Sequence, residues 1–504
     1  MFRVDPQKAI EGHAIKAAAA TNKLSPKAEE IIAAPVDSTL SGPVIAGVAQ
    51  IVEVLLLAVL GYCIHFAYVG PDQDGFYVPL ILGTSLLTNI VFNAARTHRI
   101  SAYRTSLSQI GRVIGAWAAV MVLLMVGLFF LKAGDMVSRV WLLTWFISGA
   151  VLLVIYRLML RALVQRWTDE GRLKRRAVIV GGGEDAAALI EQIKGSADKD
   201  INLLGLFDDR VGARSPDIVL GYHKLGMVAD LVDFARRTSV DLVIVSMPLS
   251  AEKRVLDMLT QLWVLPVDIR LSAHMSKLRF TNKAYSYVGD VPVLNMADKP
   301  ISDWNLVFKW VFDKFVALTA LVLLSPLMLV TAIAIKLESR GPVFFVQNRH
   351  GFNNETIRIF KFRSMRTDML DHSASRLVTK DDPRVTRVGK FIRRTSIDEL
   401  PQLFNVLKGD LSIVGPRPHA PQAKAENQLY FEAVEGYFAR HRVKPGITGW
   451  AQINGWRGET DTIDKIMQRV NHDLYYIEHW SILLDLYILL MTPISLISKT
   501  ENAY

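Results

Sequence analysis

Two adjacent carboxylic acids, Asp398 and Glu399, lie in one of the most cationic parts of the chain. Adjacent acids can share a Mg²⁺ ion, because this cation is normally held by one or two carboxylates together with substrate phosphates. One of the two carboxylates can also act as a nucleophile. Ser396 and Glu399 have the spacing of a helix capping box, so a structural role stays open for the pair, at the start of a short helix that ends near Gly409.

Cationic residues are gathered in four clusters between residues 336 and 456, with Gly, Pro and aromatic residues among them. One cluster holds Lys361 and Arg363, and the cluster around the paired acids holds Arg393 and Arg417. Guanidinium groups bind phosphate oxygens through paired hydrogen bonds, and the N–H groups of Gly-rich turns add further donors. The clusters therefore predict a phosphate or diphosphate substrate. They match no helix-turn-helix, RRM or zinc pattern, so we expect no nucleic acid as a partner.

Composition places the chain among membrane proteins. Hydrophobic residues make up 51% of the 504 residues and charged residues 21%, and the mean hydropathy is +0.25. The 58 Lys and Arg residues outnumber the 48 Asp and Glu residues, which gives a net charge of +10 and suits cationic loops on the cytoplasmic side. Cys63 is the only cysteine, which excludes an intrachain disulfide, a Cys-rich zinc site and an iron–sulfur cluster.

The elements that hold the paired acids follow a membrane region. Residues 1–40 are Ala-rich without a steady period, and we expect them to form a disordered cytoplasmic arm. A four-helix transmembrane bundle is predicted over residues 41–160, because this region contains four apolar stretches of nearly spanning length, at residues 44–69, 77–91, 113–131 and 140–156.

Loop charges predict the orientation of this bundle. The segments 96–112 and 158–176 are basic, whereas the connection 71–75 contains two Asp residues and no Lys or Arg. The positive-inside rule then places both ends of the bundle in the cytoplasm. Glu53 falls within the first apolar stretch, near the membrane interface, and we assign it no role.

Residues 173–300 have the pattern of a Rossmann-like α/β domain. Gly181 and Gly183 follow the first apolar run and fit a relaxed dinucleotide-binding fingerprint, and Asp208 lies near the place of a ribose-binding acid. The same glycines can instead allow close packing of a strand against the next helix, so both interpretations stay open. Helical segments alternate with short apolar runs, as in a parallel sheet covered on both faces, at residues 177–180, 203–207, 242–246 and 267–271.

A further apolar segment, residues 313–336, is interrupted at its middle by Ser325 and Pro326. Proline removes one helical hydrogen bond and bends the chain. A straight spanning helix would carry the basic segment after Lys336 to the outer face, against the positive-inside rule. We therefore predict a re-entrant helical hairpin that turns at Ser325 and Pro326 and returns to the cytoplasm. It opens a mainly α monotopic catalytic domain over residues 304–504.

The motifs of this last domain resemble the bacterial sugar transferases, or polyprenyl-phosphate hexose-1-phosphate transferases, whose core is a monotopic phosphoglycosyl transferase. The bundle and the α/β domain resemble the long form of that family. The resemblance implies that Asp398 attacks the β-phosphate of a UDP-sugar and releases UMP, and that Glu399 assists with Mg²⁺. It also implies that Arg393 and Arg417 bind phosphate.

The sequence after Gly458 is most similar to the members that use glucose. The resemblance implies transfer of glucose 1-phosphate from UDP-glucose to undecaprenyl phosphate, through an aspartyl-phosphosugar, as the step that initiates exopolysaccharide or capsule synthesis. We expect the carboxylate of Asp398 to have its ordinary pKa of about 4, so that it is ionised at neutral pH and needs no base. We expect a homodimer in the bacterial inner membrane, in contact with membrane lipid, with its catalytic domain in the cytoplasm.

Three alternatives stay open. The sugar can be galactose or that of another UDP-sugar, and the lipid phosphate can attack directly in a ternary complex. A membrane-anchored nucleotide-sugar dehydratase or epimerase would share the first two domains, but no Tyr here is followed by Lys at the spacing such enzymes need.

Overall fold

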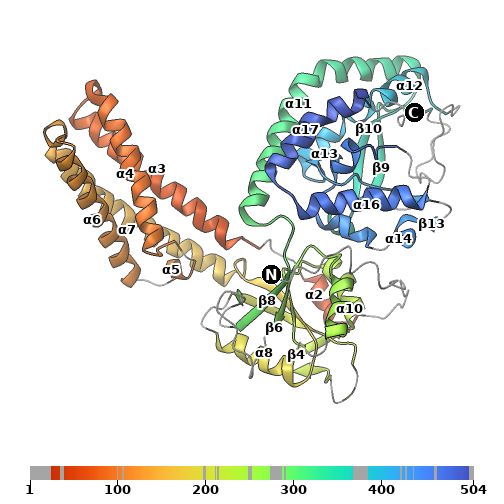
Figure 1. Ribbon diagram of the computed structural model, residues 1–504, viewed down its shortest axis with the longest axis horizontal. Coiled ribbons are helices and arrows are strands. Elements are labelled where there is room, and N and C mark those ends of the chain that lie inside the picture. The colour runs from red at the N-terminus through yellow and green to blue at the C-terminus, as the bar shows by residue number, and fades with distance from the viewer. Residues whose placement is uncertain are drawn as a thin grey trace. The chain divides into compact units, whose positions relative to one another are not determined.

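The chain divides into a membrane unit, Asp37–Arg175 with Asp198–Asn202, and a larger unit that contains the α/β and C-terminal domains (Figure 1). The computed structural model describes residues 24–34, 39–98, 100–104, 107–196, 200–210, 212, 215–247, 252–272, 286–288, 291–366, 384–420, 423–425, 428–434, 436–458 and 462–498.

The four predicted apolar stretches form the long helices α3 (Gly42–Tyr68), α4 (Asp74–Ala94), α6 (Leu107–Phe130) and α7 (Arg139–Asp169), with a short α5 (Ile100–Arg104) between α4 and α6. Ser41 and Ser138 cap α3 and α7 by accepting hydrogen bonds from backbone N–H groups of the first turn. Within the described residues, five helices are long and apolar enough to cross a membrane: these four and α11 (Asp303–Glu338) of the C-terminal domain.

Tryptophan side chains fill the core of the bundle. Trp141 and Trp145 of α7 are fully buried and donate their indole N–H groups to backbone carbonyls of α3, at 3.0 and 3.1 Å. A Cβ atom on Gly61 would lie 2.7 Å from the Trp145 ring, and one on Gly149 would lie 2.9 Å from the Trp117 ring. Small residues thus let the helices approach closely around polar aromatic groups, as is usual in membrane bundles.

The structure adds a pairing that the sequence did not predict for Glu53. Its side chain is buried inside the bundle, where one carboxylate oxygen lies 2.8 Å from Arg157 and the other 2.7 Å from His98. A charge buried among these helices is tolerated because it is paired. The position of Glu53 in the sequence could not reveal this pairing, because His98 lies in the turn after α4 and Arg157 lies on α7.

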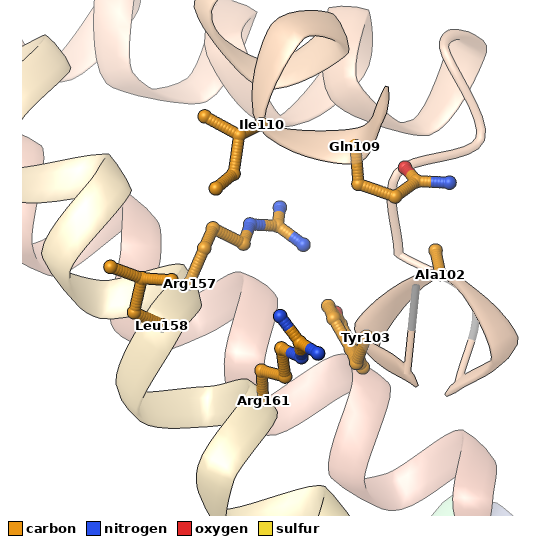
Figure 2. Close-up of a pocket in the computed structure, with 7 residues that line it drawn as sticks. All are labelled: Ala102, Tyr103, Gln109, Ile110, Arg157, Leu158 and Arg161. Atoms are coloured by element: carbon orange, nitrogen blue, oxygen red, sulfur yellow. The ribbon is translucent and has the colours of Figure 1, made fainter. Parts of the chain in front are cut away.

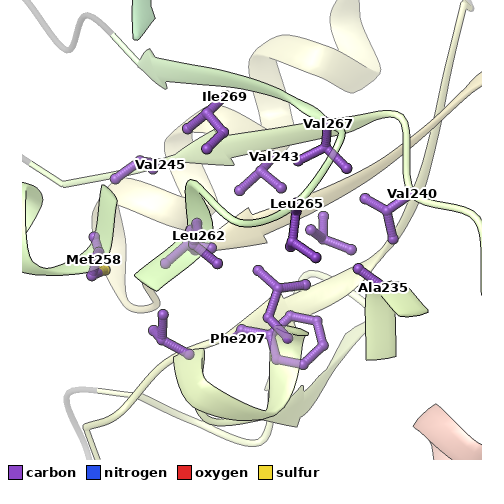
Figure 3. Packing of buried hydrophobic residues seen from close by; sticks show 14 of the residues in the cluster. Phe207, Ala235, Val240, Val243, Val245, Met258, Leu262, Leu265, Val267 and Ile269 are labelled. Carbon is purple, nitrogen blue, oxygen red and sulfur yellow. The ribbon is translucent and has the colours of Figure 1, made fainter. Parts of the chain in front are cut away.

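The α/β domain is built on an eight-stranded sheet in the order β3-β4-β2-β1-β5-β6-β8-β7. The predicted strands are confirmed, and β1 pairs in parallel with β5, as β5 does with β6. Side chains from these strands form the core shown in Figure 3, together with residues of α9 (Val228–Arg237) and α10 (Glu252–Leu262). The strands are β1 (Arg175–Val180), β2 (Ile201–Phe207), β3 (Ile218–Val219), β4 (Tyr222–Gly226), β5 (Leu242–Val245), β6 (Asp268–Ser272), β7 (Ser286–Val288) and β8 (Val291–Ala297).

Part of the expected disordered arm is ordered. Helix α2 (Pro26–Ala33) is capped by Ser25, and Ala28 is buried in the core of the α/β domain. Arg237 of α9 holds Glu29 through paired hydrogen bonds of 2.6 and 2.8 Å. An apolar stripe on this short helix therefore supplies packing that composition did not reveal. Residues 1–23 of the arm lie outside the described residues.

The C-terminal domain contains six further helices and three two-stranded sheets among its described residues. Its two cores lie around α13 and α16 and around α12. The elements are β9 (Phe344–His350), β10 (Thr356–Phe362), α12 (Arg387–Arg394), α13 (Gln402–Lys408), β11 (Ser412–Val414), β12 (Lys424–Ala425), β13 (Gln428–Leu429), α14 (Tyr430–Ala433), β14 (Gly446–Thr448), α15 (Trp450–Ile453), α16 (Ile463–Glu478) and α17 (Ile482–Ser498).

Helix α11 is continuous across Ser325 and Pro326, so the structure contains no turn between two helices at this point. The Ser325 hydroxyl donates a 2.9 Å hydrogen bond to the carbonyl of Val322 within the same helix. Figure 1 shows the axis of α11 changing direction along its length, so that the helix passes around one side of the C-terminal domain. The expected hairpin is thus replaced by one bent helix, because a proline bends a helix without having to end it.

Both halves of α11 are anchored on the same domain. Ala317 in the first half is buried in a core shared with α13 and α16. Met328 and Ile335 in the second half are buried with Phe362 and Ile392. A straight helix of this length would extend about 54 Å, which is more than a domain of this size offers to one helix. The bend therefore lets both halves pack on one domain.

The first half of α11 carries a buried charge network that fastens it to α17. Lys309 lies 2.7 Å from Asp485 of α17 and 3.3 Å from Asp313, and it donates a 2.9 Å hydrogen bond to the carbonyl of Val414. Tyr476 donates to the other oxygen of Asp485 at 2.8 Å. Every charge in this network thus has a partner.

Lys309→Met is expected to lower the unfolding midpoint of this domain by about 10 °C, because it leaves two buried carboxylates without their cation. The measurement is thermal unfolding of the full chain in detergent. Lys408→Met is the matched control, since Lys408 is 65% exposed and its pair with Asp410 is worth at most about 1 kcal/mol. Equal midpoints for the two variants would contradict the role given to Lys309.

Candidate active site

The paired acids lie on a short 3₁₀ turn, Ile397–Glu399, between α12 and α13. Asn405 of α13 fixes this region to β10: its amide oxygen accepts from the N–H of Phe360 at 2.9 Å, and its amide nitrogen donates to the carbonyl of Arg358 at 2.7 Å. Strand β10 in turn presents Lys361 to the acids. Helix α13 ends at Lys408, which confirms the predicted helix end near Gly409, and Gly409 follows in the left-handed conformation.

The expected capping box is wrong. Ser396 has a φ of 59° and forms no side-chain cap; its hydroxyl accepts a hydrogen bond from Arg457 instead. A non-glycine residue in this conformation costs of the order of 1–3 kcal/mol and often lies at a functional site. The turn therefore orients the two acids differently from a regular helix start.

Glu399 is surrounded by cations. Arg417 contacts both of its oxygens, at 2.5 and 3.1 Å, and Lys361 lies 2.8 Å from one of them. Although burial alone would raise the pKa of Glu399, the charges of Arg417 and Lys361 hold this pKa well below its usual range. Glu399 is thus ionised, and both of its oxygens are engaged.

Asp398 is in the opposite situation. Its half-buried carboxylate forms no hydrogen bond or ion pair with any residue that the structure describes. Burial raises the pKa of Asp398 to about 6, against the lowering effect of Lys361, and the neighbouring charge of Glu399 adds to the rise. The ordinary pKa expected from the sequence is therefore wrong. An uncommitted, desolvated carboxylate is the better nucleophile of the two.

A reaction that needs ionised Asp398 is expected to slow as the pH falls through about 6. The raised pKa means that protonation begins at a higher pH than for an ordinary aspartate, so the acidic limb of kcat/KM lies near 6 rather than near 4. Initial rates of UMP release between about pH 4.5 and 8 measure this limb. A rate that stays constant down to about pH 5 would contradict the raised pKa.

The other predicted phosphate ligands separate into two groups. Arg393 lies close enough to lower the pKa of Asp398, and Lys361 and Arg417 contact Glu399. Arg363 does not join them: its guanidinium is buried and donates to the carbonyls of Ser339 and Arg340 at 2.7 and 2.9 Å. This arginine satisfies the end of α11, so it positions the helix rather than a phosphate.

Two arginines of the site, Arg457 and Arg349, were not singled out from the sequence. Arg457 lies near Arg417 and both acids, and burial lowers its pKa. Arg349 of β9 also lies near Arg417 and Glu399, and burial, followed by the charge of Arg417, lowers the pKa of Arg349 to about 10. The Arg349 guanidinium donates to the neutral side chain of Gln347. The signal in the sequence was that both arginines lie in or beside the cationic clusters.

Two glycines of the cationic clusters, Gly415 and Gly446, serve backbone packing. Gly415 donates to the carbonyl of Thr448 at 2.9 Å, and Gly446 donates to that of Pro416 at 3.0 Å. A Cβ atom on Gly446 would lie 2.1 Å from the nitrogen of Gly415. These two N–H groups are therefore engaged within the protein, so the role in diphosphate binding expected for Gly-rich turns does not fall to them. They place Arg417 beside β14.

Buried groups support Arg417 from behind. Arg440 donates to the backbone carbonyl of Arg417 at 2.7 Å and lies 2.6 Å from Asp473 of α16. His419 lies against Arg440, and burial holds the pKa of His419 well below its usual range, so this histidine stays neutral. This layer fixes the backbone that carries the guanidinium contacting Glu399.

The Gly181 and Gly183 loop is separate in sequence from this site, and packing within the α/β domain accounts for its geometry. Both residues have positive φ, at 109° and 78°. A Cβ atom on Gly182 would lie 2.7 Å from the carboxylate of Asp208, and that carboxylate is paired with Arg210 at 3.0 Å. Close packing therefore requires these glycines, and the acid expected to bind a ribose already has a partner.

Asp398 and Glu399 suit a hard cation by their donor chemistry, since Mg²⁺ prefers carboxylate oxygens together with substrate phosphates. Asp398 offers an uncommitted carboxylate, and Glu399 lies beside it with its oxygens paired to cations. Among the described residues no group of three or more His, Cys, Asp and Glu side chains could hold a metal ion. The pair therefore fits a cation bound mainly through a substrate.

Fold and site together define a membrane-anchored protein with an uncommitted carboxylate in an arginine-rich site. The model of the bacterial sugar transferase family matches residues 304–499, and that of a CoA-binding domain matches residues 94–273. The chain belongs to the bacterial sugar transferase family.

Three relatives show the extent of the similarity. The undecaprenyl-phosphate glucose phosphotransferase of Komagataeibacter xylinus is 42% identical over 69% of this chain and 64% of that protein. The UDP-glucose:undecaprenyl-phosphate glucose-1-phosphate transferase of Xanthomonas campestris pv. campestris is 35% identical over 85% of this chain and 90% of its own. The UDP-N-acetylgalactosamine-undecaprenyl-phosphate N-acetylgalactosaminephosphotransferase of Aeromonas hydrophila is 47% identical over 36% of this chain and 41% of its own.

Proposed function

We propose that this protein transfers glucose 1-phosphate from UDP-glucose to undecaprenyl phosphate, yielding undecaprenyl-diphosphate-glucose and UMP. The main support is the free carboxylate of Asp398 beside a Glu399 that is fully engaged by Arg417 and Lys361. Relatives that match most of this chain are named for glucose, which supports that sugar. A relative that matches a shorter part is named for N-acetylgalactosamine, so the sugar needs a direct test.

In the proposed first step an oxygen of Asp398 attacks the β-phosphorus of UDP-glucose. The bond from this phosphorus to the bridging oxygen breaks, and UMP leaves with the bonding electron pair. An acyl phosphate then joins Asp398 to glucose. In the second step a phosphate oxygen of the lipid attacks the same phosphorus and restores the carboxylate. Phosphoryl transfer depends mainly on positioning and charge neutralisation, which the arginines around Glu399 supply.

Glu399 has a positioning role in this scheme. Its charge holds Arg417 and Lys361 in place, so that cations surround the phosphate attacked by Asp398. Mg²⁺ would be held by Asp398 and Glu399 together with diphosphate oxygens, and it would supply further neutralisation of charge.

The test of the function is UMP release from UDP-glucose, UDP-galactose and UDP-N-acetylgalactosamine, with and without undecaprenyl phosphate. We expect turnover with UDP-glucose and lipid, and a hexose-phosphate lipid product by mass spectrometry. Turnover with only one of the other two UDP-sugars would change the assignment of the sugar. The absence of UMP with every donor would reject the proposed reaction.

We also propose that α11 is re-entrant and that the catalytic domain lies on the cytoplasmic face of the inner membrane. Both halves of this helix pack on the same domain while its outer face is apolar. Basic residues follow its second half, in accord with the positive-inside rule. The homodimer stays a prediction.

Cysteines introduced at exposed Asn305 and Arg340, near the two ends of α11, are expected to react from the same side of the membrane. The background is Cys63→Ser, which removes the natural thiol. An impermeant thiol reagent applied to intact cells should leave both positions unlabelled, whereas inverted vesicles should label both. Labelling at Arg340→Cys alone in intact cells would show a spanning helix.

A further inference from the structure

The membrane unit contains a small pocket between α5, α6 and α7 (Figure 2). Figure 2 shows the guanidinium groups of Arg157 and Arg161 directed into this space, with Ile110 and Gln109 above them on α6. Apolar side chains and Tyr103, whose buried hydroxyl has no hydrogen-bond partner within the described residues, line the rest of the wall. The lining residues are Ala102, Tyr103, Gln109, Ile110, Arg157, Leu158 and Arg161.

The two arginines differ in how well their charge is balanced. Arg157 is paired with buried Glu53 at 2.8 Å and donates to the carbonyl of Thr97 at 2.9 Å. Arg161, one helical turn later on α7, has no carboxylate partner among the residues that the structure describes. The buried Nε atoms of both arginines, and the buried Oε1 atom of Gln109, have no hydrogen-bond partner within the described residues.

An unsatisfied buried donor costs about 1–3 kcal/mol, so a ligand that supplies acceptor oxygens would stabilise this arrangement. An anionic acceptor would also balance the charge of Arg161, since Glu53 is already shared between Arg157 and His98. Oxyanions with several oxygens suit two neighbouring guanidinium groups.

The pocket lies at the end of the apolar segments of α6 and α7, where we expect the lipid headgroups. Arg157 and Arg161 come directly after the apolar part of α7, and Gln109 and Ile110 lie in the first turn of α6, before its apolar part. Cationic side chains at the end of a span face the interfacial layer of the membrane. Apolar Ile110 and Leu158 would contact the first carbons of a lipid chain.

We propose that this pocket binds the phosphate group of a membrane lipid through Arg161 and Arg157. The chemistry is shared by a phosphodiester headgroup and by a polyprenyl phosphate monoester, so either lipid can supply it. None of these residues belongs to the active site described above, so this proposal does not rest on the proposed function.

The test uses the full chain in detergent and native mass spectrometry, with bound lipids counted per chain. Phosphatidylglycerol and undecaprenyl phosphate are titrated separately, and diacylglycerol, which has no phosphate, is the lipid control. Arg161→Gln is expected to weaken binding of a phosphate lipid at one site by about tenfold, the effect of losing charged hydrogen bonds. Arg166→Gln is the matched control, because Arg166 lies on the same helix with its side chain 77% exposed.

If Arg161→Gln loses a bound lipid in the phosphatidylglycerol titration, the pocket binds a diester headgroup. If it loses one in the undecaprenyl phosphate titration, the pocket binds a monoester. Identical lipid binding by Arg161→Gln and Arg166→Gln in both titrations would overturn the proposal. Binding of diacylglycerol as tight as that of the phosphate lipids would also overturn it. If Arg161→Gln fails to fold, Tyr103→Phe keeps the test decisive: it removes a buried hydroxyl that lines the pocket without a hydrogen-bond partner within the described residues, and the expected loss is about fivefold. Arg161→Lys should restore part of the binding, since it keeps the charge but not the paired geometry.

Discussion

Asp398→Asn is expected to lower UMP release from UDP-glucose at least about a thousandfold, with or without undecaprenyl phosphate. The amide keeps the shape of the side chain but is a poor nucleophile. Because Asp398 makes no ion pair within the described residues, its replacement leaves no cation unpaired and should not disturb the fold. Binding of UDP-glucose, measured by calorimetry, should change only a few-fold.

The covalent intermediate gives this prediction a second measurement. Wild-type protein incubated with UDP-glucose and Mg²⁺ alone should release about one UMP per chain and carry a hexose-phosphate on the peptide that contains Asp398. Asp464→Asn is the matched control, because Asp464 is exposed on α16. If UMP forms only when lipid is present and no adduct is found, the lipid phosphate attacks directly and Asp398 serves another purpose.

Glu399→Gln is expected to lower kcat by about 10²–10³-fold while leaving UDP-glucose bound. The neutral amide no longer balances Arg417 and Lys361, so the cations lose the position that the carboxylate gives them. Glu399 also helps to raise the pKa of Asp398. The acidic limb of the residual activity should therefore move below about pH 6.

The shift of the acidic limb of the pH–rate profile separates an electrostatic role of Glu399 from a general loss of structure. Misfolding would lower the activity without moving this limb. Glu355→Gln is the control, since Glu355 is exposed beside β10. The limb of that variant should stay near pH 6, where the pKa of Asp398 places it. An unchanged rate and an unchanged limb in Glu399→Gln would remove Glu399 from the mechanism.

The sequence was sufficient for features that local chemistry decides. The length of the apolar stretches identified the four helices of the bundle, and short apolar runs identified the four inner strands of the α/β domain. Both signals depend only on the order of apolar and polar residues along a short segment. The adjacency of Asp398 and Glu399 within cationic clusters identified the candidate site. Arginine is the side chain best suited to paired hydrogen bonds with phosphate, so its clustering around two acids indicated the type of substrate.

Tertiary structure decided how these groups are used. Asp398 and Glu399 are neighbours in the chain, yet of the two only Glu399 is contacted by Arg417 and Lys361, so burial leaves the pKa of Asp398 raised while the cations lower that of Glu399. Likewise Arg363 supports the end of α11 instead of a substrate. The pairing of Glu53 with Arg157 also required the fold, because the two residues are 104 positions apart in the chain. Charge partners and desolvation depend on distances in space, and spacing along the chain does not contain them.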